Sequence, residues 1–311
     1  FKQKTAYEML RSLVGSEMCI RDREIKMYQI IRKERLHQTI YSMWIEAPQV
    51  AQSVQPGQFI ILMVKEKGER IPLTVADFDR EKGLIRLVFQ VVGKTTDELS
   101  TLEEGDRLFS FIGPLGKKTE IGDYGTVVTV GGGTGIACIH PIARALKEAG
   151  NKVISIIGAR SKDLIIMEEE LKRASSELIV TTDDGSYGRK GFVTQVLKEL
   201  LDKDKSIKKV WAIGPAIMMK VTCETTRPYA VETIVSLNSI MVDGTGMCGS
   251  CRVTIGGETK FVCTDGPEFD GQLVDWEEFM NRLTRYKTQE KKSWEIYQKH
   301  NPSCTCGRRQ E

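Results

Sequence analysis

The chain has 311 residues, enough for two or three domains, and its formal net charge at pH 7 is only +3. Because lysines and arginines are interleaved with acidic residues, the sequence lacks the basic stripe of a nucleic-acid-binding protein. No apolar run approaches the roughly 18 residues that a membrane-spanning helix needs. The longest, residues 127–142, is interrupted by three consecutive glycines. We therefore expect a soluble, cytoplasmic protein without a nucleic-acid or membrane partner.

Residues 1–23 do not fit the rest of the chain. The segment follows no clear strand or helix pattern, and it resembles the translated read-through of a sequencing adapter. We expect an artefact of this kind rather than a real N-terminal arm, so residues 1–23, Cys19 included, do not enter the fold prediction.

Short strands and turns dominate residues 24–116. Runs rich in Ile, Val and Phe are separated by Gly, Pro and charged turns, which predicts a small antiparallel β-barrel. The five runs cover residues 26–36, 38–47, 57–65, 83–92 and 106–113.

Strands alternate with helices over residues 117–223. This alternation predicts a doubly wound parallel sheet. Residues 224–275 then form a cysteine-rich lobe, and residues 276–311 form a charged helical tail. The expected strands are 125–130, 152–160, 177–185 and 208–215, and the expected helices are 138–150, 163–175 and 192–203.

A glycine-rich turn joins the first of these strands to its helix. Glycines there let the backbone approach a pyrophosphate, whose charge the free N–H groups of the helix start can bind. The spacing is not the strict Gly-x-Gly-x-x-Gly fingerprint, so a tight turn without a ligand stays an alternative. Later strands of the same sheet also end in glycines, which favours a dinucleotide site. Its predicted residues are Gly131, Gly133, Thr134, Gly135, Gly158, Arg160, Asp184, Gly214 and Pro215.

Two short motifs in the barrel offer contacts for a flavin. An arginine and small hydroxyl residues beside a strand can hold a flavin ring and a phosphate, although each motif alone also fits ordinary solvated structure. The first motif comprises Arg70, Pro72, Leu73 and Thr74, and the second comprises Gly93, Lys94, Thr95 and Thr96.

The order of these motifs resembles the ferredoxin–NADP reductase superfamily over about residues 28–223. In that family the barrel carries FAD and the α/β domain carries NAD(P), so the resemblance implies both cofactors. Arg160 and Ser161 follow the second strand of the sheet, where NADP enzymes often place ligands of the 2′-phosphate.

Residues 241–263, MVDGTGMCGSCRVTIGGETKFVC, have the cysteine spacing of a metal site. Cys248 and Cys251 form a C-x2-C, and Cys263 follows. Counting back by the plant-type ferredoxin spacing places the missing first ligand at Asp243, whose carboxylate can coordinate iron. The predicted site is a [2Fe–2S] cluster held by these four residues. A zinc site with the same ligands and unliganded thiols are the alternatives.

The stretch 236–271 resembles the small-subunit family of NADH-dependent reduced ferredoxin:NADP oxidoreductases, also known as sulfide dehydrogenase beta subunits. This resemblance implies FAD, a [2Fe–2S] cluster with one Asp and three Cys ligands, and an NAD(H) site. It implies hydride exchange between NAD(H) and FAD, followed by one-electron transfer through the cluster. It also implies a larger partner subunit with a second FAD, [4Fe–4S] clusters and an NADP site, which performs electron bifurcation with ferredoxin.

Two other functions stay open. The electron-transfer subunit of dihydroorotate dehydrogenase is related, but it has four cysteines at this spacing, so Asp243 favours the first family. A non-catalytic scaffold with structural zinc is the alternative from a different class. Outside the cluster motif, we expect Cys138 and Cys223 to be buried, with a position near the nicotinamide as the alternative for Cys223. We expect Cys304 and Cys306 to lie in a mobile tail, with an added metal or redox site as the alternative.

Overall fold

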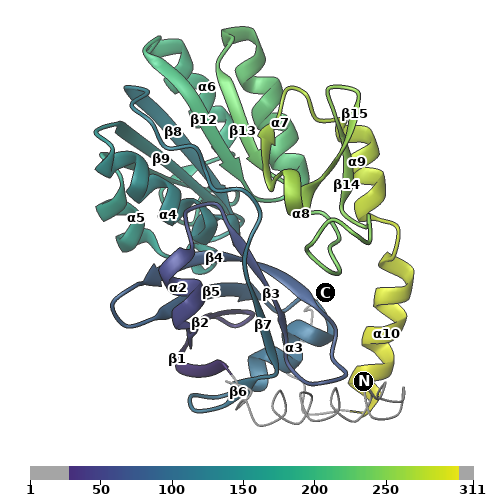
Figure 1. Cartoon of the computed structure of the whole chain (residues 1–311). Coiled ribbons are helices and arrows are strands. Elements are labelled where there is room, and N and C mark those ends of the chain that lie inside the picture. The colour runs from purple at the N-terminus through teal and green to yellow at the C-terminus, as the bar shows by residue number, and fades with distance from the viewer. Residues whose placement is uncertain (1–27, 301–311) are drawn as a thin grey trace, which may run out of the picture.

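The computed structural model describes residues 28–300, without the side chain of His300. Cys19, Cys304 and Cys306 lie outside this range. Two seven-stranded sheets and one two-stranded sheet organise the described residues, and the barrel and the parallel sheet lie one above the other in Figure 1. Within residues 28–300, none of the helices is long and apolar enough to cross a membrane.

The first sheet is the predicted antiparallel barrel. Its strand order is β6-β1-β2-β5-β4-β3-β7, and every neighbouring pair is antiparallel. Alternate side chains of these strands, such as Met43 and Ile45, point inward into a common apolar core because successive strand residues face opposite sides. The elements are β1 (Tyr28–His37), β2 (Ile40–Glu46), α2 (Pro48–Ser53), β3 (Phe59–Met63), β4 (Ile71–Asp79), β5 (Leu84–Gln90), α3 (Lys94–Thr101), β6 (Arg107–Leu108) and β7 (Ser110–Leu115).

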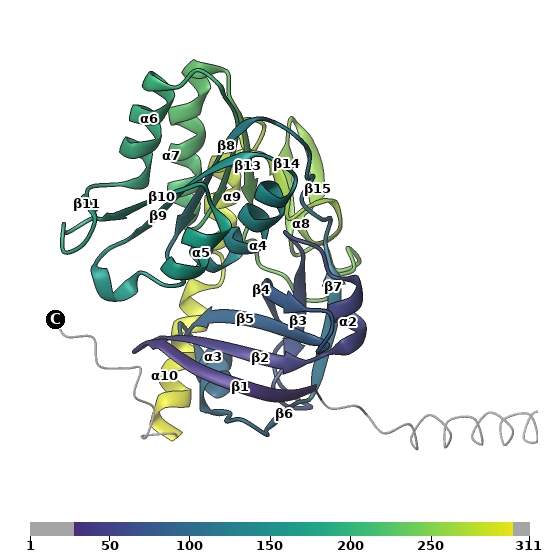
Figure 2. The same cartoon turned by 90° about the vertical axis from the view of Figure 1, so that its left-hand side faces the viewer.

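The second sheet has the order β11-β10-β9-β8-β12-β13-β16 and is parallel except at the β13–β16 edge. Helices α4 and α5 cover one face and α6 and α7 cover the other, so the predicted doubly wound sheet is confirmed (Figure 2). Its elements are β8 (Thr126–Gly132), α4 (Gly135–Glu148), β9 (Lys152–Ala159), η1 (Lys162–Leu164), α5 (Glu168–Ala174), β10 (Glu177–Thr182), β11 (Arg189–Lys190), α6 (Val193–Lys203), β12 (Ile207–Ile213), α7 (Ala216–Thr226), η2 (Arg227–Tyr229) and β13 (Glu232–Ser236).

One predicted helix is shorter than the sequence indicated. The expected helix 163–175 is a short 3₁₀ turn followed by α5 from Glu168, because Met167 adopts a left-handed conformation with φ of 53°. Isoleucines 165 and 166 therefore lie in the connection, where Ile166 still packs into the core.

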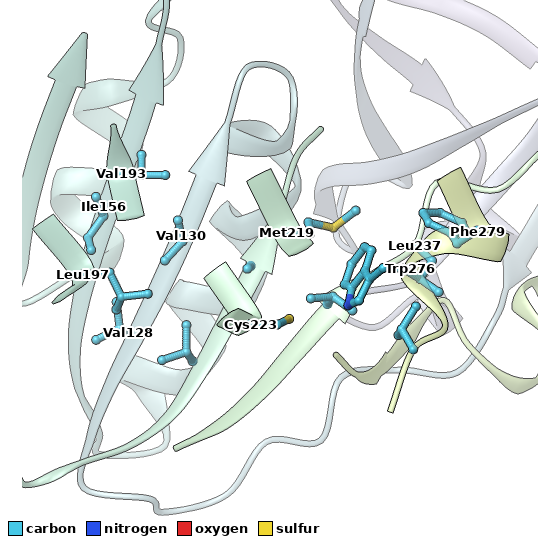
Figure 3. Close-up of a cluster of buried hydrophobic side chains, with 14 of the residues drawn as sticks. Val128, Val130, Ile156, Val193, Leu197, Met219, Cys223, Leu237, Trp276 and Phe279 are labelled. Carbon is cyan, nitrogen blue, oxygen red and sulfur yellow. The ribbon is translucent and has the colours of Figure 1, made fainter. Parts of the chain in front are cut away.

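The cysteine-rich segment is built onto the parallel sheet. Its strand β16 pairs antiparallel with β13, with Val235 opposite Phe269. The boundary placed at residue 224 therefore does not coincide with a break between sheets. Figure 3 shows why: one core runs from Val128 on β8 past Cys223 on α7 to Trp276 on α9. The elements are β14 (Arg252–Ile255), β15 (Glu258–Phe261), α8 (Val262–Asp265), β16 (Glu268–Asp270), α9 (Trp276–Leu283) and α10 (Lys287–His300).

Candidate functional site

The glycine-rich turn between β8 and α4 brings the helix start against the neighbouring strand. A Cβ on Gly135 would lie 2.1 Å from the carbonyl oxygen of Ile213, so only glycine permits this approach of α4 to β12. Gly133 has a φ of +56°, and a Cβ there would meet nothing within 4 Å. The turn is therefore open on the side where a phosphate can reach the N–H groups of α4.

The other predicted glycines of the nucleotide site meet at the same edge of the sheet. The Gly133 N–H donates to the carbonyl of Gly158 at 3.1 Å, and a Cβ on Gly214 would lie 3.0 Å from the Gly132 carbonyl oxygen. Pro215 follows at the start of α7 and is exposed. The carboxyl ends of β8, β9 and β12 thus converge where α/β sheets bind nucleotides.

Arg160 and Asp184 lie next to each other after β9 and β10. The Asp184 N–H donates to the Arg160 carbonyl at 3.1 Å, and both residues are exposed. Hydrogen bonds from the Ser186 hydroxyl and N–H lower the pKa of the Asp184 carboxyl, which is therefore ionised at neutral pH. Two exposed charged residues therefore lie at neighbouring strand ends, where the ribose of a nucleotide is expected.

The two predicted flavin motifs are neighbours in the barrel. Thr95, in the first turn of α3, donates a hydrogen bond from its hydroxyl to Glu69, which directly precedes Arg70. The Thr96 hydroxyl accepts from the Gly93 N–H at 3.1 Å and so caps the helix. A Cβ on Gly93 would meet nothing within 4 Å. The start of α3 is thus open, as a phosphate site requires.

Arg70 is exposed just before β4, whereas Pro72, Leu73 and Thr74 are half-buried on that strand. Sequence reasoning missed Glu69, whose bond to Thr95 joins the two motifs. In the sequence, only the position of Glu69 next to Arg70 could have indicated that it belongs to this site.

The four predicted cluster ligands form two pairs. The sulfurs of Cys251 and Cys263, both buried, lie 3.3 Å apart. Two sulfur ligands of one tetrahedral metal, each at a bond length of about 2.3 Å, would be separated by about 3.8 Å. The Asp243 carboxylate accepts from the N–H groups of Cys248 and Thr245, each at 2.9 Å. Two such pairs are what a centre with two irons needs.

The two pairs are not joined into one ligand sphere. Among residues 28–300, no group of three or more His, Cys, Asp or Glu side chains is already placed to hold a metal ion. The loop from Asp243 to Cys251 is rich in glycines with positive φ, a conformation that turns successive N–H groups toward an anionic centre. These are Gly244, Gly246 and Gly249, with φ of 76°, 82° and 65°. The donor set and this loop both fit an iron–sulfur cluster.

The thiols differ in acidity. Burial, together with the neighbouring Cys251, raises the pKa of Cys263 to about 12. Hydrogen bonds with Ser250 lower the pKa of the exposed Cys248. Because metal ligands are thiolates, binding at this site must release the proton of Cys263, which the free thiol holds at neutral pH.

Of the two cysteines that we expected to be buried, Cys223 is buried, whereas Cys138 is only half-buried on α4. Burial raises the pKa of Cys223 to about 12, and its side chain packs in the core between α7 and the C-terminal segment (Figure 3). Burial likewise raises the pKa of Cys138 to about 11. Neither thiol is ionised near neutral pH, so neither is poised as a nucleophile.

Comparison with known proteins matches two regions of the chain that contain these candidate sites. A family profile described as an oxidoreductase NAD-binding domain matches residues 129–224, and one described as the iron–sulfur cluster binding domain of dihydroorotate dehydrogenase B matches residues 238–275. The chain is 51% identical over 271 residues to the dihydroorotate dehydrogenase B (NAD(+)) electron transfer subunit homolog of Thermotoga maritima, covering 87% of this chain and 95% of that protein. The chain belongs to this family of electron-transfer subunits.

Three further matches range from members of the family to a protein that shares only the fold. The dihydroorotate dehydrogenase B electron transfer subunit of Desulforamulus reducens is 34% identical over 245 residues, covering 76% of this chain and 93% of that protein. A chain of the solved NADH-dependent reduced ferredoxin-NADP oxidoreductase is 50% identical, with a TM-score of 0.83 over 87% of this chain and 98% of that chain. The cytochrome P450 reductase GcoB of Amycolatopsis, at 22% identity and a TM-score of 0.56 over 65% of each chain, shares the fold.

These matches confirm the predicted class of protein. The chain is an oxidoreductase subunit that transfers electrons, with a ferredoxin-reductase-type flavin barrel, an NAD-binding domain and an iron–sulfur domain. FAD, a [2Fe–2S] cluster and NAD(H) are its cofactors. As an electron-transfer subunit it works with a partner subunit.

Proposed function

We propose that this chain is the NADH-binding subunit of a ferredoxin:NADP oxidoreductase complex and delivers single electrons to a larger partner. The 50% identity to a chain of the NADH-dependent reduced ferredoxin-NADP oxidoreductase, over 98% of that chain, supports this assignment. Asp243 supports it too, because an acidic residue stands where the plant-type cluster spacing has its first cysteine.

The observation that carries the proposal is the contact between the cluster loop and the flavin barrel. A Cβ on Gly244, which follows Asp243, would lie 2.6 Å from Ile61 Cδ1 on β3 and 2.8 Å from Leu115 Cδ1 on β7. The loop therefore packs directly on the barrel strands. This places the two redox halves of the chain side by side, which a structural zinc site would not require.

A second connection holds the cluster segment in this position. The Lys117 N–H donates to the Gly266 carbonyl at 2.6 Å, and the Thr119 hydroxyl donates to Glu268 at 2.6 Å. Both bonds join the linker between barrel and parallel sheet to the segment that follows Cys263. We infer that these contacts fix the distance over which electrons pass.

When bound, the cofactors would supply the electron chemistry, namely hydride exchange between nicotinamide and flavin and one-electron transfer at the [2Fe–2S] cluster. The protein binds and orients them. We propose that α3 and α4 direct their free N–H groups at the phosphates of FAD and NAD(H), respectively. Arg70 and Lys94 add positive charge at the flavin, and Thr74 and Pro72 line its ring from β4. Asp243, Cys248, Cys251 and Cys263 hold the cluster.

The partner is proposed from the same resemblance. It would be a larger subunit with a second FAD, [4Fe–4S] clusters and an NADP site, and ferredoxin would be reached through it. The dihydroorotate dehydrogenase complex is the second candidate, because several relatives and the matched iron–sulfur domain carry its name. Purification of the native complex under anaerobic conditions separates the two, since the copurified subunit either reduces NADP or oxidises dihydroorotate.

Anaerobic reduction of the purified subunit tests the function itself. We expect NADH to bleach the flavin absorbance and then to reduce the cluster, and we expect NADH to act faster than NADPH despite the nearby Arg160. A colourless, zinc-containing protein would contradict the proposal. A strong preference for NADPH would contradict the assignment of the nucleotide but leave the electron transfer intact.

A further inference from the structure

A small pocket lies between the cluster loop and helix α9. Its volume is about 230 Å³, and its walls include Cys248, Ser250 and Phe279. This is below the roughly 300 Å³ at which pockets for drug-sized ligands begin, so it suits a small ligand or one group of a larger one. Of the four predicted cluster ligands only Cys248 lines it, so the pocket borders the predicted cluster site and shares one wall with it.

The pocket is strongly basic. Arg252, Arg282 and Arg285 all contribute to its walls, and no Asp or Glu is among the lining residues. The nearest carboxylate contact is long, since Glu278 Oε1 lies 3.9 Å from Arg282 Nη1. Within residues 28–300, Arg252 and Arg285 have no ion-pair partner. Arg252 Nε donates to the Gly249 carbonyl at 3.2 Å, and Arg282 Nη2 donates to the Ser250 carbonyl at 3.3 Å. Three arginines therefore line one pocket, and their partners within the described residues are backbone oxygens rather than a close carboxylate.

A buried hydroxyl in the same wall points to a missing partner. Ser239 is only 9% exposed, and its Oγ has no hydrogen-bond partner within the described part of the chain. Leaving a buried polar group unpaired is unfavourable, so such groups are rare unless a ligand or water satisfies them. Because Ser239 also lines the pocket, a rotation of its side chain can offer the hydroxyl to an anion that the arginines attract.

We propose that this pocket is an oxyanion site that takes the phosphate or carboxylate group of a small ligand. The fork of donors on each arginine matches the geometry of such groups, and Ser239 supplies a neutral donor beside them. The site is separate from the phosphate positions expected at the starts of α3 and α4. Nothing in the proposal depends on which partner subunit the chain has.

Calorimetric titration of the cofactor-loaded protein with inorganic phosphate, and separately with acetate, tests the site. The titrations are run with NAD⁺ at saturation and at constant ionic strength, so that the nucleotide site is filled. We expect one saturable site for at least one anion. Arg282→Gln and Arg285→Gln should each weaken it at least tenfold, and Arg32→Gln, a change to an exposed arginine on β1, should leave it unchanged.

Ser239→Ala separates a binding role from a structural one. Without anion, the variant should be as stable as the wild type or more so, because the unpaired hydroxyl is gone. With anion, it should bind at least tenfold more weakly. Absence of binding by both anions at millimolar concentration, or binding that all three pocket variants retain, would overturn the proposal.

Discussion

The carboxylate of Asp243 accepts a hydrogen bond from the backbone N–H of Cys248 at 2.9 Å, so these two residues already stand together in the cluster loop. The backbone bonds to Thr245 and Cys248 lower the pKa of the Asp243 carboxyl, which is thus an anion at neutral pH. An ionised carboxylate beside an exposed thiol is a usable half of a two-iron site. The other half is the buried pair Cys251 and Cys263.

Gly244→Ala should damage the cluster loop. The change imposes a Cβ on a residue with φ of +76°, which costs about 1–2 kcal/mol, and it drives that Cβ into Ile61 and Leu115, which adds about 1–3 kcal/mol. Gly257→Ala is the matched control, because its φ of +83° gives the same backbone strain without a contact within 4 Å. Iron content and thermal unfolding would check this. Equal effects of the two variants would refute the packing of the loop on the barrel.

Gly133→Ala and Gly135→Ala should separate nucleotide binding from folding. Alanine at residue 133 costs about 1–2 kcal/mol of backbone strain because φ is +56°, but its methyl group meets no atom within 4 Å. We therefore expect a folded protein that binds NADH about tenfold more weakly, a loss of about 1.4 kcal/mol. Alanine at residue 135 collides with the Ile213 carbonyl and should lower the unfolding temperature instead. Fluorescence titration with NADH and calorimetry measure the two effects. Unchanged NADH affinity in Gly133→Ala would place the pyrophosphate elsewhere.

Glu268 should make stability depend on pH. Burial raises the pKa of its carboxyl to about 7 from an ordinary value of 4.5. The folded state therefore holds the proton more tightly than the unfolded state. The resulting stabilisation is complete below pH 4.5 and is lost as the pH rises through 7.

Glu268→Gln removes this titration while keeping an acceptor for Thr119. Relative to the variant, the wild type should lose up to about 3 kcal/mol of unfolding free energy between pH 5 and pH 8. Chemical denaturation at several pH values provides the measurement. Parallel pH profiles for the two proteins would show that the carboxyl does not titrate in this range.

Local patterns in the sequence were sufficient to predict most of the fold and to propose residues for each candidate site. The alternation of strand and helix and the glycines at 131, 133 and 135 are short-range signals, and the structure follows them. Long-range pairing left no such signal. The sequence around Phe269 does not indicate that it pairs with Val235 on the parallel sheet. The sequence around Thr119 does not indicate its hydrogen bond to Glu268.

The same reason explains what the sequence did not reveal about the sites. Glu69 links the two flavin motifs only because α3 folds back on the segment before β4. The arginines of the oxyanion pocket come from β14 and from α9 and the turn after it, and they meet only in three dimensions. The sequence could propose Asp243 as a ligand because ferredoxin spacing is itself a local pattern.

The central claim is tested most directly by comparing the wild type with Asp243→Cys and Asp243→Ala. The measurements are iron and acid-labile sulfide content and electron paramagnetic resonance of the reduced protein. The account predicts a [2Fe–2S] cluster in the wild type, a retained cluster with a shifted potential in Asp243→Cys, and a lost or unstable cluster in Asp243→Ala, because oxygen and sulfur ligands donate charge differently. A full cluster with an unchanged potential in Asp243→Ala would contradict it.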